Sequence, residues 1–283
     1  MPATFKLTLN LEESRVQGYH LGANTNAAIL NLIEGKNREN AVLSKAMHDR
    51  NPKPYHLDLE HYAGFGGNDG ARAELRIHII QDSLIPKLQD LLKPNMPFGT
   101  KSNPLYGHLS KIQTEFDMPY TEFVTKALDM PTQRRSSINF LTSTSLSAKI
   151  PTGALPIPLV LLNGLRIRFE EYSGYRLEGR LNRYVENSFR CLECRTIEDK
   201  IKKISDKEEH HGFVGNAVYM AEGAESSAQT IALLLRFAEW SGVGENVAAG
   251  FGHVQTDFEA EEIDEKEKRG EILRVVRSEK NAI

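Results

Sequence analysis

The segment Gly242-Val-Gly-Glu-Asn-Val-Ala-Ala-Gly-Phe-Gly-His-Val254 holds four glycines within eleven residues. It follows an apolar run that ends at Trp240 and precedes the alternating residues 254–258, so it joins an expected helix to an expected strand. Glycines this dense indicate positive φ angles or a close approach to the backbone. Loops rich in main-chain N–H groups also suit phosphate groups. The loop is therefore a candidate site for a phosphorylated ligand.

The rest of the second half alternates between strand-like and helix-like patterns around this loop. A basic amphipathic region runs to residue 204, and an acidic turn is expected at 206–209. We expect strands and helices from apolar periodicity in this order: strand 137–146, helix 159–171, strand 212–221, helix 228–240 and strand 252–258.

The first half has a similar order of expected elements, beginning with alternation over residues 4–11. It comprises strand 4–11, helices 27–34 and 38–47, strands 55–60 and 73–80, helix 83–92 and strand 107–116. This order is the ferredoxin-like plan. The fold expected is α+β, with two tandem ferredoxin-like domains at 1–130 and 131–258, a linker at 125–135 and a charged tail at 259–283.

Composition limits the class of protein further. The chain has 283 residues, 40% hydrophobic residues and a mean hydropathy of −0.42. No apolar run approaches the ~20 residues that a membrane-spanning helix needs, and the N-terminus lacks the layout of a signal peptide. We therefore expect a cytoplasmic protein with no membrane partner.

The two cysteines, Cys191 and Cys194, give little support for a metal or a disulfide. A reducing compartment argues against a structural disulfide, and a zinc site needs two further ligands. The plausible downstream ligands are His210 and His211, but the favoured interpretation is that no metal is bound. Tyr55, His56 and His61 cluster in sequence but are set aside as catalytic candidates, because strand alternation would split them between the two faces. The sequence predicts no cofactor.

Positive charge is concentrated in one part of the chain although the net charge is −3. Residues 133–203 contain thirteen basic and seven acidic side chains, many of the basic ones being arginine. Arginine suits phosphate binding and base stacking, although any one of them can equally be a solvated surface residue. The candidates for binding nucleic acid are Arg134, Arg135, Arg166 and Arg168.

Several segments together resemble one family, the CRISPR-associated repeat-specific endoribonucleases of the repeat-associated mysterious protein (RAMP) superfamily. The glycine-rich loop at 242–254 is similar to the C-terminal loop of that family. Other similar segments, in the order in which the family has them, are residues 40–48, 140–145, 156–165 and 210–219. The resemblance implies a protein that cuts precursor CRISPR RNA within each repeat.

The resemblance also implies a chemistry and a set of site residues. The cut needs no metal: the ribose 2′-OH attacks phosphorus and leaves a 2′,3′-cyclic phosphate and a 5′-OH. His48 resembles the histidine that ends a catalytic helix in many relatives, and histidine titrates near neutrality. Lys53 is expected to stabilise the phosphorane, and His20 is a second acid–base candidate. RNA is expected to lie on the backbone of Gly242, Gly244, Gly250 and Gly252.

Two departures leave other functions open. Relatives often carry basic residues where this loop has Glu245 and Asn246, and the tyrosine that some place in the first helix is missing. A non-catalytic RNA-binding RAMP subunit of an interference complex is therefore an alternative, and a protein-binding scaffold is another. CRISPR repeat RNA, interference-complex subunits and a second copy of the chain are the partners considered.

Overall fold

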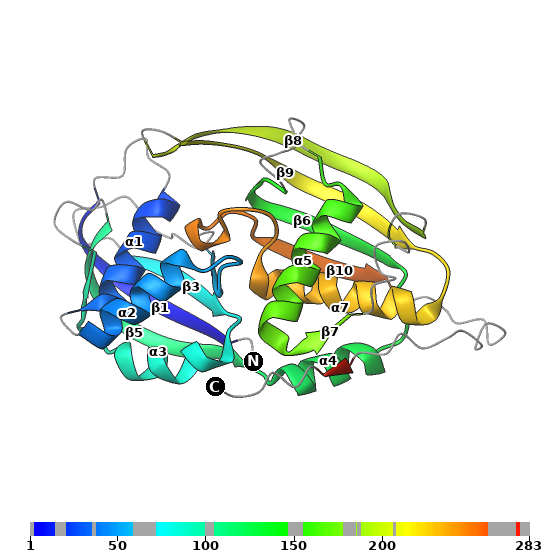
Figure 1. The fold of residues 1–283 in the computed structure, drawn as a ribbon. Coiled ribbons are helices and arrows are strands. Elements are labelled where there is room, and N and C mark those ends of the chain that lie inside the picture. The colour runs from blue at the N-terminus through cyan, green and yellow to red at the C-terminus, as the bar shows by residue number, and fades with distance from the viewer. Residues whose placement is uncertain are drawn as a thin grey trace.

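The computed structural model describes residues 3–14, 21–35, 38–58, 72–99, 105–146, 155–177, 185, 188–205, 208–259 and 276–277. These residues form two antiparallel sheets with helices packed against them (Figure 1). No helix among them is long and apolar enough to cross a lipid bilayer.

The first half of the chain builds a five-stranded sheet in the order β2-β3-β1-β5-β4. Apolar residues alternate along β1, and Phe5, Leu7 and Leu9 are buried there, as a sheet with one face on a core requires. The elements are β1 (Ala3–Ser14), α1 (Leu21–Glu34), α2 (Arg38–Asp49), β2 (Tyr55–Asp58), β3 (Arg72–Ile79), η1 (Asp82–Leu84), α3 (Ile85–Leu91), β4 (Pro97–Phe98) and β5 (Leu105–Asp117).

The second half builds a four-stranded sheet in the order β10-β6-β9-β8. A short additional pair joins β7 (Tyr175–Arg176) to β11 (Val276–Arg277). The other elements are α4 (Tyr120–Asp129), β6 (Arg135–Thr144), α5 (Pro158–Ser173), β8 (Phe189–Ser205), β9 (Glu208–Ala221), α7 (Glu225–Ser241), η2 (Val247–Ala249) and β10 (Val254–Glu259).

The two sheets share one strand order once β4 is set aside. In each half the first and third strands in sequence lie at the centre, the fourth pairs with the first, and the second pairs with the third. The predicted α+β fold with tandem ferredoxin-like domains is confirmed by this architecture. Each half has its own cluster of buried apolar side chains.

The expected linker at 125–135 is wrong over its first part, because α4 continues to Asp129. The apolar residues of α4 lie at helical spacing and pack into the core of the second half. Phe123 meets the ring of Trp240 edge-on, with ring centroids 5.2 Å apart. The buried residues of α4 are Tyr120, Phe123, Val124 and Ala127. The domain boundary at 130 stays a prediction.

Two other expectations are corrected by the structure. The basic region before residue 204 is the long strand β8, which pairs along β9 and lies at the edge of the sheet. The helix expected from residue 27 begins earlier, at Leu21 in α1. Of the acidic turn expected at 206–209, residues 208–209 belong to β9, and residues 206–207 and nearly all of the tail fall outside the described residues.

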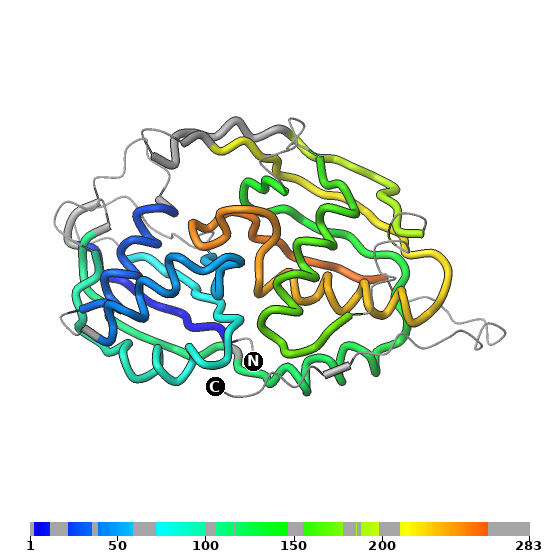
Figure 2. Tube along the Cα trace, in the orientation of Figure 1, coloured from blue at the N-terminus to red at the C-terminus, as the bar shows by residue number. Residues whose placement is uncertain are grey.

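The glycine-rich loop lies between the two halves. Figures 1 and 2 show this segment, in orange, reaching from the end of α7 toward α1 and β2. Ala248 in η2 belongs to the buried cluster of the first half, although the chain around it belongs to the second. The loop therefore joins the two cores rather than lying on one surface.

The packing of α4 predicts a large effect of truncating Phe123. We expect Phe123→Ala to lower the free energy of unfolding by about 3–5 kcal/mol, because a buried aromatic leaves a cavity. Denaturant unfolding followed by the fluorescence of Trp240, the single tryptophan, measures this. Val42→Ala, at a residue that is 66% exposed on α2, should change stability by less than about 0.5 kcal/mol. Equal losses for the two variants would contradict the assignment of α4 to the core.

Candidate functional site

The glycine-rich loop closes on itself and on the end of β6. The main-chain N–H of Val243 donates to the carbonyl of Gly252 at 2.9 Å, and that of Gly252 donates to Ser143 at 3.0 Å. Glu245 donates through its main chain to Ser145 at 2.8 Å. These bonds hold the loop in one defined conformation and satisfy several of its backbone polar groups.

Glycine is required at two places in this loop because the backbone approaches itself. Gly252 has φ +67°, and a Cβ atom there would overlap the carbonyl oxygen of Val243. Gly244 has φ +77°, and its Cβ would overlap the carbonyl oxygen of Ser145. The density of glycine is therefore explained by contacts within the chain, with no ligand needed.

Arg168 on α5 fixes the start of the loop through hydrogen bonds. Its guanidinium donates to the carbonyls of Gly242, at 2.7 Å, and of Gly244 and Ser241. The side chain is buried, and burial lowers the pKa of Arg168 to about 10, which leaves it charged at neutral pH. The planar fork of arginine suits three convergent carbonyls better than a lysine would. Arg168 thus fixes the loop, and its expected contact with RNA stays a prediction.

The four glycines expected to present backbone to RNA do not all have an amide to offer. The N–H groups of Gly242, Gly250 and Gly252 donate to Ala238, Val247 and Ser143 respectively. Gly244 is the half-buried member of the four, and the following residues at the tip, Glu245 and Asn246, are exposed. The contact of this loop with RNA stays a prediction. Fewer of the loop's main-chain N–H groups are available to bind RNA than the sequence indicated.

The loop packs between the two halves through apolar and ring contacts. Phe251 is fully buried and stacks on His210, with centroids 3.9 Å apart. On the other side, a Cβ added at Gly242 would lie 3.0 Å from the ring of His56 on β2. The position of the loop is thus set by both sheets at once.

His48 and Lys53, two of the predicted catalytic residues, lie together at the end of α2. The Lys53 ammonium donates to the main-chain carbonyl of His48, a C-terminal helix contact that lysine commonly makes. The His48 side chain is 66% exposed, and its Nδ1 lies 3.1 Å from Asp49. The hydrogen bond to His48 lowers the pKa of Asp49, and burial lowers the pKa of Lys53.

The end of α2 borders the same junction as the glycine-rich loop. Arg50 pairs with Glu171 of α5 at 3.0 Å, and its guanidinium lies 5.5 Å from the ring centre of Tyr172. The Tyr172 hydroxyl donates to the carbonyl of Pro52. The segment after His48 is therefore fixed on α5, the helix whose Arg168 holds the loop. His20, the second acid–base candidate, lies outside the described residues.

Two of the predicted RNA-binding arginines lie far from the loop. Arg134 donates to the carbonyls of Ala221 and Gly223, and Arg135 pairs with Glu259 at 3.4 Å. Arg135 begins β6 and the loop packs on its other end, about 30 Å away at ~3.3 Å per residue. Arg166 on α5 is half-buried, and its Nε has no hydrogen-bond partner among the described residues.

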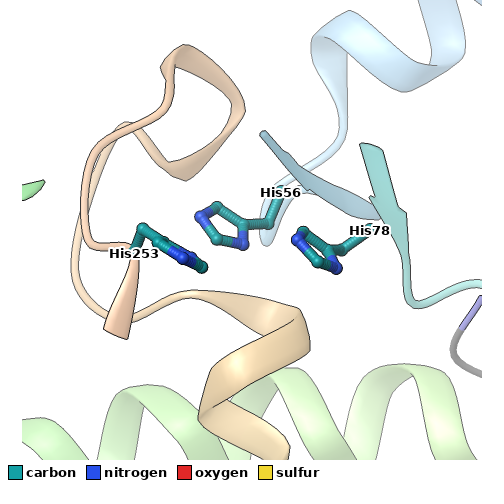
Figure 3. A group of neighbouring side chains, drawn as sticks. All are labelled: His56, His78 and His253. Carbon is teal, nitrogen blue, oxygen red and sulfur yellow. The ribbon is translucent and has the colours of Figure 1, made fainter. Parts of the chain in front are cut away.

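Sequence reasoning missed a cluster of three histidines at the junction. His56 on β2 and His78 on β3 lie opposite each other in the sheet register, and His253 lies at the end of the glycine-rich loop (Figure 3). One ring nitrogen from each of the three histidines lies within 4.8 Å of the other two. Burial lowers the pKa of His56 well below its usual range and that of His78 to about 3, so both rings are neutral near pH 7.

The alternative zinc site at the cysteines is not assembled. Cys191 and Cys194 lie on β8, and Cys194 is paired with Ala217. His210 is seven positions further along β9, or about 23 Å away at ~3.3 Å per residue. The two cysteines and His210 therefore cannot share an ion.

Comparisons with known proteins agree with this arrangement. Residues 138–254 match the family model described as CRISPR-associated endoribonuclease Cas6, and no curated protein sequence matches the chain. A Cas6 product complex superposes with a TM-score of 0.70 at 18% identity, covering 90% of this chain and 100% of that chain. The Thermus thermophilus Cas6 has a TM-score of 0.65 at 17% identity, covering 90% and 98%.

A more distant structure, described as a RAMP protein binding different RNA substrates, has a TM-score of 0.57 at 13% identity, covering 90% and 99%. The family match contains the glycine-rich loop and Arg168, and the structural likeness extends the shared fold to the first half. The resemblance to the Cas6-type endoribonucleases of the RAMP superfamily, first drawn from the glycine-rich loop, is confirmed.

Removing the guanidinium of Arg168 should release the loop. We expect Arg168→Met to lower the free energy of unfolding by about 3 kcal/mol, because three buried carbonyls lose a charged donor. The matched control is Arg190→Met, at an exposed residue paired with Glu222 at 3.3 Å, which should cost less than about 1 kcal/mol. Denaturant unfolding measures both, and a loss as small as that of the control would overturn the role of Arg168.

A methyl group at Gly252 should also displace the loop. We expect Gly252→Ala to cost about 2–4 kcal/mol, because it combines a positive φ with overlap on Val243. Gly164→Ala is the matched control: that glycine lies within α5 with no atom within 4 Å of an added Cβ, so alanine should stabilise the helix by up to about 1 kcal/mol. Hydrogen exchange at the amides of Val243 and Gly252 reports the loop directly, and unchanged protection would contradict the prediction.

Proposed function

We propose that this protein is a metal-independent endoribonuclease that binds CRISPR repeat RNA and cleaves precursor CRISPR RNA. The Cas6 family match and the shared fold support RNA processing as its activity. The observation that carries the proposal is the exposed imidazole of His48 beside the ammonium of Lys53, at the junction bordered by the glycine-rich loop. The proposal assigns the protein to the cytoplasm, where its RNA is made.

The proposed reaction forms a bond between the ribose 2′ oxygen and phosphorus, and it breaks the bond from phosphorus to the 5′ oxygen. A base takes the proton of the 2′-OH, and an acid gives a proton to the leaving oxygen. His48 performs one of these transfers, since an exposed imidazole can reach a strand and histidine is the side chain most often used as a general acid or base. Each such transfer typically contributes ~10²–10⁴-fold in rate.

Lys53 is proposed to stabilise the negative charge that develops on the phosphorane. An ammonium has three donors, and its contact with the carbonyl of His48 uses one of them. That contact also fixes the nitrogen next to the helix end that carries the imidazole. A charge held in advance where the transition state becomes more negative lowers the barrier without reorganisation.

RNA is proposed to be held along the junction rather than on the far end of β6. Arg166 on α5 and Gly244 in the loop remain the candidates on this side of the molecule, since Arg168 is buried beneath the loop. Hairpin RNA is recognised mainly through shape, phosphates and 2′-hydroxyl groups. Contacts of this kind need exposed donors along a strand path and no single deep pocket.

A non-catalytic RNA-binding RAMP subunit of an interference complex is the second candidate. The acidic Glu245 at the exposed tip of the loop favours it, because a carboxylate there opposes a phosphate that must be bound tightly. Interference-complex subunits and a second copy of the chain remain predicted partners under either function.

The deciding experiment is cleavage of an end-labelled repeat RNA in magnesium-free buffer containing EDTA. We expect a 5′-OH product and a 2′,3′-cyclic phosphate from the native protein. His48→Ala should slow single-turnover cleavage by about 10²–10⁴-fold while RNA affinity stays within about threefold, because an exposed side chain contributes little binding energy. Lys53→Ala and His20→Ala are measured beside it.

The matched control is His211→Ala, at another exposed histidine, on β9, which should leave the rate unchanged. Tight binding without any cut by the native protein would favour the non-catalytic subunit. A cut that needs Mg²⁺, or one that His48→Ala leaves intact, would contradict the proposed chemistry. Neither binding nor cutting in low salt would favour the scaffold.

A further inference from the structure

Three histidines from segments far apart in sequence meet where the two halves join. His56 and His78 come from neighbouring strands of the first sheet, and His253 comes from the loop carried by the second half. Figure 3 shows the three rings side by side, with the loop on one side and the two strands on the other. His56 and His78 are buried, and His253 is half-buried.

The ring nitrogens are close to the spacing that a metal ion needs. One nitrogen from each ring lies within 4.8 Å of the other two, and the ring centroids are 5.2 to 6.2 Å apart. A tetrahedral zinc ion with bonds of about 2.0–2.1 Å requires nitrogens about 3.4 Å apart. Each nitrogen would therefore move by up to about 1 Å, which rotation about the side-chain torsions supplies.

The surroundings of two of the rings match those of metal-binding histidines. Nδ1 of His78 hydrogen-bonds the hydroxyl of Thr4 at 2.9 Å, and its buried Nε2 has no hydrogen-bond partner among the described residues. Nε2 of His253 lies 3.7 Å from the buried carboxylate of Asp58. Oxygen atoms that engage one ring nitrogen and direct the other to an ion are typical of such sites.

His56 lies between the other two rings, and its surroundings also suit a metal ligand. Neither of its ring nitrogens has a hydrogen-bond partner of good geometry among the described residues, and a hydrogen-bonding contact with the main chain of Trp240 offsets only part of the lowering of its pKa by burial. Buried polar atoms with incomplete hydrogen bonds in native structures can mark an ion or a water. The Asp58 carboxylate also offsets part of the positive charge that an ion would add near Arg168.

We propose that His56, His78 and His253 bind one zinc ion, with Asp58 and Thr4 orienting two of the ligands. The ion fastens the glycine-rich loop to the first sheet. Three imidazoles leave one position for water, a known arrangement for zinc. The main chain of His253 also joins the end of the loop to β6: its carbonyl accepts from Leu141 and its N–H donates to the hydroxyl of Thr142, each at 2.9 Å. An ion bound to the His253 ring therefore restrains the main chain of the loop as well.

Metal content of the untagged full chain tests this proposal. The protein is stripped with a chelator, dialysed against ZnCl2 and analysed by mass spectrometry of the metal. We expect one zinc per chain, and a rise in Tm of at least about 5 °C at saturating zinc. Co²⁺ in place of zinc should give the strong visible absorption of a tetrahedral site.

His56→Gln and His253→Gln should each abolish both the stoichiometric ion and the thermal shift. The matched control is His210→Gln, since that histidine is also buried and contacts the loop through Phe251 but lies outside the cluster. It should retain one ion. Circular dichroism of each apo variant verifies folding, so a lost ion is not mistaken for a lost fold.

Failure of the native chain to retain zinc overturns the proposal without any variant. So does zinc that binds equally to His56→Gln and His253→Gln, or that is lost from His210→Gln alone. None of these measurements uses RNA, so their outcome is independent of the cleavage assay.

Discussion

The buried guanidinium of Arg168 and the carbonyls it gathers are the interaction on which the arrangement of the two halves depends. The guanidinium on α5 donates hydrogen bonds to the carbonyls of Ser241, Gly242 and Gly244. A single side chain therefore positions both the end of α7 and the start of the loop. With the loop fixed, η2 can place Ala248 in the core of the first half. The glycines then allow the close path of the backbone, and the guanidinium of Arg168 stabilises that path through its three carbonyl contacts.

Much of the fold was predictable because the buried strands and helices carry regular apolar periodicity. The long strand β8 was missed since it lies at a sheet edge and many of its side chains, such as Ile197 and Arg195, are exposed. An edge strand of this kind has little apolar alternation and resembles a solvated basic segment. Helix α4 does have a helical pattern, with four apolar residues at helical spacing that end at Ala127. Pro131, close after it, favoured the prediction of a linker instead.

The candidate site also has one part that the local sequence predicts and one part that it does not. His48 and Lys53 are five residues apart and local, so a helix end and a following proline-rich turn were enough to place them together. The histidine cluster depends on register and on tertiary packing. His56 and His78 become neighbours only through the pairing of β2 with β3, and strand alternation argued against His56. All four residues of β2 are buried, because the loop covers the face that alternation would leave to solvent.

Exposure separates the two kinds of histidine at this junction. A group that exchanges protons with RNA must be reached by it, and the imidazole of His48 is 66% exposed. The rings of His56 and His78 are covered by the sheet and the loop, so they cannot contact a strand unless the halves separate. Their chemistry is therefore that of fixed neutral ligands. The proposed structural ion and the proposed metal-free cleavage at His48 are compatible, since the ion would hold the loop in place while His48 would act on bound RNA.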